Sequence, residues 1–209
     1  MALSLNIGSR LLSLVGDSAA LDERAEELIA MAIEQGFPYW RALGTAYRGW
    51  VTVKNGAVTE GISLLRSGSA TYSGEAWMTQ IIALLAGACE IAGQIEEALI
   101  LLDDALQIVE RTGERWFVAE LNRLKGQLLL RQGHSEAAEE LYRKALSIAR
   151  QQEAKLWELR AAASLARLRR DQGRRAEACD ILTPGYGWFT EGFDTPDLRE
   201  ARALLDAST

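Results

Sequence analysis

Five arginines in the second half of this 209-residue chain are the residues whose type and spacing most suggest a chemistry. An arginine fork pairs with two oxygens of a carboxylate or phosphate at once. Because the five lie in stretches of helical periodicity, they could converge on one side of the molecule: Arg123, Arg131, Arg160, Arg167 and Arg170. The pattern predicts a site for an acidic peptide segment or an anionic small ligand.

The same arginines have a plainer interpretation. Glu120, Glu158 and Asp171 lie close to them in sequence, and arginine and acid side chains at such spacings form solvated ion pairs on helix faces that contribute little each. The residues alone leave both interpretations open.

The sequence offers no set of side chains for catalysis or metal binding. His134 is the single histidine, and it follows a turn glycine without acidic or cysteine partners at ligand spacing. Cys89 and Cys179 lie far apart and are expected to be small buried thiols, which suits a reducing compartment. No GxxxxGK[ST] phosphate loop is found. We therefore expect a chain that is not an enzyme and holds neither cofactor nor metal.

Charge and hydropathy narrow the class of partner. A net charge of −6 argues against nucleic-acid binding, which needs a surplus of Lys and Arg. The longest apolar stretch, 81–89, is far shorter than the ~20 residues of a membrane span, and residues 1–7 lack the basic start of a signal peptide. We expect a cytoplasmic protein with a protein or peptide partner and no membrane contact.

A repeat supplies the elements that must position these side chains. Turn glycines recur at Gly56, Gly93, Gly133 and Gly173, with spacings of 37, 40 and 40 residues. Small residues stand seven before and five after each glycine: Gly49, Ala86, Gly126 and Ala166, then Gly61, Ala98, Ala138 and Ala178. Aromatic residues keep the same register: Trp40, Trp77, Phe117 and Trp157. Small rows let paired helices approach closely, and the aromatic row is expected to fill the seam between units.

The pattern predicts an all-α fold, a right-handed superhelical array of antiparallel helix pairs. We expect helices over residues 2–15, 18–35, 38–54, 57–71, 75–92, 95–112, 114–132, 135–152, 154–172, 174–183 and 196–207. They form one domain, 1–209, with a degenerate unit at 1–36, repeats at 37–73, 74–113, 114–153 and 154–190, and a capping helix at 195–207.

Two features of the C-terminal end complete the prediction. Thr183, Pro184 and Gly185 are expected to end the tenth helix early, and the capping helix is expected to turn Glu200 outward. The aromatic-rich loop 186–193 is either a docking surface for a partner or a segment that folds back under the capping helix.

The spacing of small, turn and large residues resembles the tetratricopeptide repeat (TPR), lengthened from 34 residues. That resemblance implies that the first helix of each pair lines a concave groove, which gives the candidate binding residues Trp50, Arg123, Gln127, Arg131, Arg160, Arg167 and Arg170. Ala46, Ala83 and Ala163 stand where a chaperone-binding TPR would carry long polar side chains. Binding to chaperone tails is therefore disfavoured.

Four stretches carry a closer resemblance: 34–40; 112–116 with 119–126; 149–152 with 157–161 and 164–167; and 186–195. They look like the C-terminal repeat region of bacterial class III adenylate or guanylate cyclases, or transcriptional regulators, that carry a signal-transduction ATPase module. The resemblance implies a sensor or scaffold segment in signalling. The alternative is a scaffold that self-associates through its N-terminal end.

Overall fold

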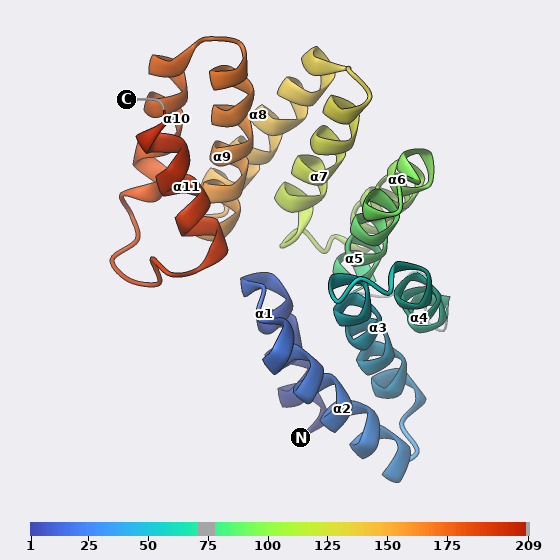
Figure 1. Cartoon of the computed structure of the whole chain (residues 1–209). Helices are drawn as coiled ribbons and strands as arrows, with labels where there is room; N and C mark the ends of the chain where they lie inside the picture. The colour runs from blue at the N-terminus through green and yellow to red at the C-terminus, as the bar shows by residue number, and fades with distance from the viewer. Residues whose placement is uncertain (71–77, 208–209) are drawn as a thin grey trace. The chain divides into compact units, whose positions relative to one another are not determined.

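The computed structural model describes residues 1–70 and 78–207, and over these ranges the chain forms eleven α-helices and no strand (Figure 1). The all-α prediction is confirmed. The helices are α1 (Ala2–Val15), α2 (Ser18–Glu34), α3 (Pro38–Lys54), α4 (Val58–Ala70), α5 (Met78–Ile91), α6 (Ile95–Thr112), α7 (Val118–Arg131), α8 (Ser135–Gln151), α9 (Lys155–Asp171), α10 (Arg175–Tyr186) and α11 (Pro196–Asp206). The predictions for residue 71, for 75–77 including Trp77, and for the repeat boundary at 73 lie outside the described residues.

The chain divides into two compact units, Met1–Glu114 with α1 to α6 and Arg115–Thr209 with α7 to α11. In the second unit, α7 packs along α8 and α9 along α10, and α8 joins the two hairpins by packing on α9. The first unit repeats this scheme with α3 on α4 and α5 on α6. That the two units continue as one array over residues 1–209 stays a prediction.

The predicted turn glycines hold the left-handed conformation that ends the first helix of a pair. Gly56, Gly93, Gly133 and Gly173 have φ values between 77° and 96°, a region that other residues enter only at a cost in energy. The small rows bring the paired backbones together. A Cβ atom on Gly49 would lie 2.8 Å from the carbonyl oxygen of Gly61. Both predictions are confirmed.

The aromatic row fills the seam between hairpins in the second unit. The rings of Phe117 and Trp157 meet edge to face with centroids 5.2 Å apart, and both side chains are buried. The indole N–H of Trp157 donates to the carbonyl oxygen of Trp116 at 3.1 Å. The contact therefore fixes α9 against the start of α7 with an apolar and a polar component.

Two predicted boundaries were wrong. Helix α10 continues through Pro184 to Tyr186, because proline removes only its own N–H donor, and Gly187 N–H still bonds to the carbonyl of Thr183 at 2.9 Å. Helix α7 begins at Val118 rather than 114. The left-handed Gly113 ends α6, and residues 113–117 form no helix before Val118.

The capping helix α11 packs on both helices of the last hairpin, α9 and α10. Pro196 occupies its first turn, where a missing N–H costs nothing. Leu198, Ala201 and Leu204 are buried in the core of the second unit. Burial of this apolar face determines which side chains of α11 lie next to α9.

Candidate functional site

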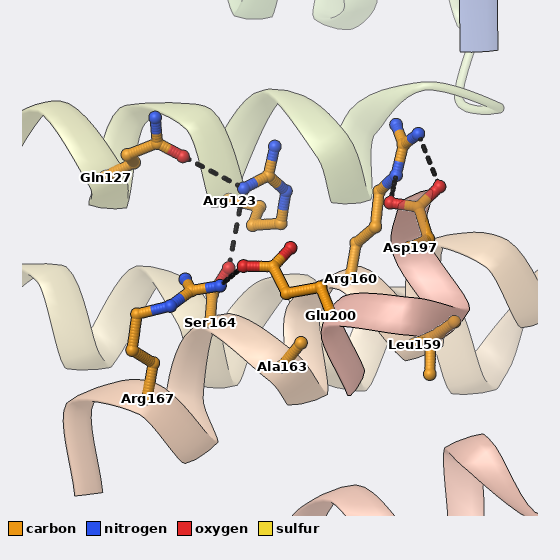
Figure 2. Close-up of a pocket in the computed structure, with 9 residues that line it drawn as sticks. All are labelled: Arg123, Gln127, Leu159, Arg160, Ala163, Ser164, Arg167, Asp197 and Glu200. Carbon is orange, nitrogen blue, oxygen red and sulfur yellow. Dashed lines mark hydrogen bonds and ion pairs between the residues drawn. The ribbon is translucent and has the colours of Figure 1, made fainter. Parts of the chain in front are cut away.

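A pocket of about 410 Å³ lies in the second unit between α7, α9 and α11 (Figure 2). Five of its nine lining residues are charged, and two, Leu159 and Ala163, are apolar. The lining residues are Arg123, Gln127, Leu159, Arg160, Ala163, Ser164, Arg167, Asp197 and Glu200.

Helical periodicity places these side chains on shared faces. Arg160, Ser164 and Arg167 fall four and three residues apart on α9, so all three point to the same side. Arg123 and Gln127 stand one turn apart on α7. On α9, Ala163 lies between Arg160 and Arg167, and its side chain is too short to fill the space between theirs. The pocket therefore exists because a small residue separates long polar ones.

The inner part of the site is a buried ion network. Arg123 grips Glu120 with Nε and Nη2 at 2.7 and 2.9 Å. Arg160 grips Asp197 with Nε and Nη2, both at 2.9 Å, and its Nη1 reaches Glu120 at 3.1 Å. The Glu120 side chain is only 5% exposed. The network thus links α7, α9 and α11 through two-pronged, charge-assisted hydrogen bonds.

The electrostatics of Glu120 show which effect dominates. Burial by itself would raise the pKa of this carboxyl, but the adjacent guanidinium groups of Arg123 and Arg160 outweigh it and lower the pKa from 4.5 to about 2. Glu120 is therefore ionised at neutral pH, and its buried charge depends on those two arginines.

The outer part of the site is more accessible. Arg167 forms an ion pair with Glu200, and their side chains are 37% and 54% exposed. One Nη of Arg123 donates to Gln127 Oε1 at 3.1 Å and approaches Ser164 Oγ at 3.4 Å. In the whole site, three guanidinium groups thus pair with three carboxylates. Two of these carboxylates, Asp197 and Glu200, belong to the capping helix.

The structure unites four of the seven predicted site residues: Arg123, Gln127, Arg160 and Arg167. The other three lie outside this pocket. Arg170 pairs with Asp171 at 2.8 Å, and Arg131 is exposed at the end of α7. Trp50 belongs to the first unit, where Lys54 Nζ lies 5.6 Å from its ring centre.

The plainer interpretation of the arginines is correct in part. Arg123 pairs with Glu120 and Arg170 with Asp171. However, Glu120 is buried rather than solvated. Glu158 pairs instead with Arg150 and Lys155, at 3.1 and 2.8 Å. The ion pairs of Glu120 are thus buried rather than solvated, whereas the Arg167–Glu200 pair of the same pocket is exposed.

Sequence reasoning missed the acidic side of the pocket. Glu200 was expected to face outward, and its side chain is 54% exposed, but it also pairs with Arg167 and lines the pocket, which was not predicted. Asp197 was not among the predicted site residues. The available signal was the spacing of Asp197 and Glu200, one helical turn apart on the polar face of an amphipathic helix.

The aromatic loop divides between its two predicted roles. Tyr186 and Phe189 pack against the core of the second unit, whereas Trp188 and Phe193 are 57% and 47% exposed. The Tyr186 and Phe193 rings lie 5.9 Å apart beside a second pocket that they line with Arg199, Arg202, Ala203 and Asp206.

Two other kinds of feature are absent from the described residues. No cluster of three or more His, Cys, Asp or Glu side chains that could hold a metal ion occurs there. No helix within residues 1–70 and 78–207 is both long enough and apolar enough to cross a bilayer.

Comparison with known proteins supports the repeat assignment. Residues 78–151 match the tetratricopeptide repeat family. None of the curated proteins matches the sequence. The structure of BtubC (BKLC) from P. vanneervenii is similar, with a TM-score of 0.65 and 16% identity over 95% of this chain and 89% of that chain.

Two further solved structures resemble this one. A kinesin light chain protein of Podospora anserina with nearly identical TPR-like repeats has a TM-score of 0.60 and 20% identity over 98% of this chain and 94% of that chain. MamA has a TM-score of 0.52 and 14% identity, covering 95% of each chain. At such identities the likeness establishes the fold alone, a TPR-like α-solenoid.

Proposed function

We propose that this chain, which has the fold of a TPR-like α-solenoid, is a non-catalytic module that binds an acidic segment of a protein partner. The observation that carries the proposal is the convergence of Arg123, Arg160 and Arg167 from α7 and α9 on one pocket. Arginine forks in a partly buried pocket recognise carboxylates with defined geometry.

The charge balance of the repeat helices favours two carboxylates in the bound segment. Around the pocket, α7 and α9 contribute three guanidinium groups but only one carboxylate, that of Glu120. Two positive charges on these helices are left to be met from outside α7 and α9. A segment with two acidic side chains matches that requirement, and a neutral or basic segment does not.

We further propose that binding of this partner regulates a signalling enzyme in the bacterial cytoplasm. The resemblance of stretches such as 119–126 and 186–195 to the repeat region of cyclase and ATPase signalling proteins supports this role. In that context the chain acts as sensor or scaffold, and the catalytic step belongs to an attached or partner domain.

Self-association is the second candidate function, and one observation favours it. Helix α1 buries the polar residues Asn6 and Ser9. It exposes apolar side chains one turn apart, at Leu3, Ile7, Leu11 and Val15, with exposed fractions of 42–56%. An exposed apolar stripe of this kind is typical of a protein interface.

Titration of the full chain with a labelled peptide tests the main proposal. The probe is an alanine-based helical peptide that carries aspartate and glutamate three residues apart, with its Asn/Gln counterpart as control. Fluorescence anisotropy should show binding of the acidic peptide only, weakened about tenfold by Arg167→Gln and unchanged by Arg170→Gln. Equal binding of both peptides would refute charge recognition.

A further inference from the structure

The acidic residues that face the pocket come from the chain's own last helix. Asp197 and Glu200 stand one turn apart on α11 and pair with Arg160 and Arg167 of α9 (Figure 2). They supply the two negative charges that α7 and α9 leave unmet. The pocket is therefore already neutral while α11 lies in place.

We propose that α11 is an internal mimic of the partner. This inference rests on the proposed function: Asp197 and Glu200 occupy the guanidinium groups that a partner's acidic segment would use. The partner must then replace these carboxylates. Its apparent affinity is its intrinsic affinity multiplied by the fraction of molecules in which the carboxylates have released the arginines.

The exchange requires rotation of two side chains rather than loss of the helix. Leu198, Ala201 and Leu204 anchor the other face of α11 in the core, with at most 6% exposure each. Glu200 is 54% exposed and can turn into solvent, whereas Asp197 is 19% exposed and held at two points. The Arg167–Glu200 pair is thus the first to open.

The geometry also narrows the chemistry of the partner. Arg160 and Arg167 lie two helical turns apart on α9, and Ala163 leaves the space between them open. The two carboxylates of α11, which lie one turn apart on that helix, reach both of these arginines. We therefore expect an acidic helix whose two acids lie one turn apart, in place of an extended strand or a single terminal carboxylate.

Neutralising the mimic in the full chain tests this proposal. The double variant D197N/E200Q removes both charges and keeps the shape of α11. A matched control, E191Q/D206N, removes two charges from residues that do not line the pocket. The probe is again the alanine-based helical peptide with aspartate and glutamate three residues apart, measured by fluorescence anisotropy at fixed ionic strength.

The mimic predicts that D197N/E200Q binds the acidic peptide about tenfold more tightly than the unmodified chain, as relief of a roughly 90% occupied site requires. The control variant should match the unmodified chain, and adding Arg167→Gln to D197N/E200Q should abolish the gain. Circular dichroism confirms folding, and E200Q alone, at a half-exposed position, gives a smaller gain if the double variant is unstable.

The outcomes separate the two proposals. Equal affinity of the peptide for the unmodified chain and for D197N/E200Q would overturn the mimic and leave the acidic-partner function standing. No binding to either protein would overturn both. An equal gain in D197N/E200Q and in E191Q/D206N would reduce the effect to net charge and so also overturn the mimic.

Discussion

Arg160 and Asp197 join the last repeat hairpin to the capping helix through a two-pronged ion pair, with both nitrogen–oxygen distances at 2.9 Å. The same guanidinium reaches Glu120 on α7. One side chain on α9 therefore links three helices. It lines the pocket, so the stability of the second unit and the charge of the pocket depend on one network.

Removal of Arg160 should destabilise the second unit strongly. In Arg160→Gln, the buried Glu120 loses one of its two cationic partners and Asp197 loses both of its hydrogen bonds. Breaking a buried pair from one side costs about 3–5 kcal/mol. Urea unfolding followed by circular dichroism checks the loss. Arg202→Gln, which removes an exposed pair with Asp206 and a hydrogen bond with Tyr186, is the control and should shift the unfolding midpoint far less.

Glu120 predicts a specific dependence of stability on pH. Its pKa is lowered in the folded state, so it contributes stability at pH values above the ordinary 4.5, and that contribution is lost as pH falls toward about 2. Glu120→Gln should therefore be less stable than the unmodified chain at pH 7, and the difference should shrink below pH 4.5. A difference in unfolding free energy that stays constant from pH 7 to pH 2.5 would contradict this assignment.

Replacement of glycine by alanine should have opposite effects at Gly49, where α3 closely approaches α4, and at Gly87 on α5. The Cβ atom of Gly49→Ala would lie 2.8 Å from backbone atoms of Gly61 and Leu65, so it should destabilise the fold by about 1–3 kcal/mol. Gly87→Ala on α5 would meet only the Trp50 ring at 3.5 Å, an ordinary contact. Because alanine favours helix over glycine, this control should stabilise the chain by about 0.5–1 kcal/mol in thermal unfolding.

The second candidate function predicts association through α1. Ile7→Asp combined with Leu11→Asp places charges on its exposed stripe and should shift the chain toward monomer in a light-scattering concentration series. Ile100→Asp, at an isolated apolar residue that is 62% exposed, is the matched control. A chain that is monomeric at every concentration before any substitution would exclude this function.

Much of the fold could be predicted because the signals were local. A glycine with positive φ at each turn, and small residues at fixed distances from it, determine where helices end and where they touch. Gly56 and Gly133, for example, give the ends of α3 and α7 to within two residues. Pro184 misled because proline is a helix breaker on average, whereas one missing donor is tolerated in the last turn.

The site was harder to predict because it depends on contacts distant in sequence. The shared face of Arg160 and Arg167 follows from helix periodicity alone. Their acidic partners stand 37 and 33 residues later in the chain, on α11. Only the packing of Leu198 and Leu204 turns that helix so that its acids face α9. No spacing rule connects residues across two helices and a loop.

A double-mutant cycle shows whether Arg167 recognises a carboxylate of an acidic partner. Dissociation constants are measured for the full chain and Arg167→Gln, each with the acidic helical peptide and with the peptide in which glutamate is replaced by glutamine. If Arg167 pairs with the glutamate of the peptide, the coupling free energy between the two changes should be about 1 kcal/mol or more. Effects that add to within about 0.3 kcal/mol would show that the two groups do not interact and would contradict this pairing.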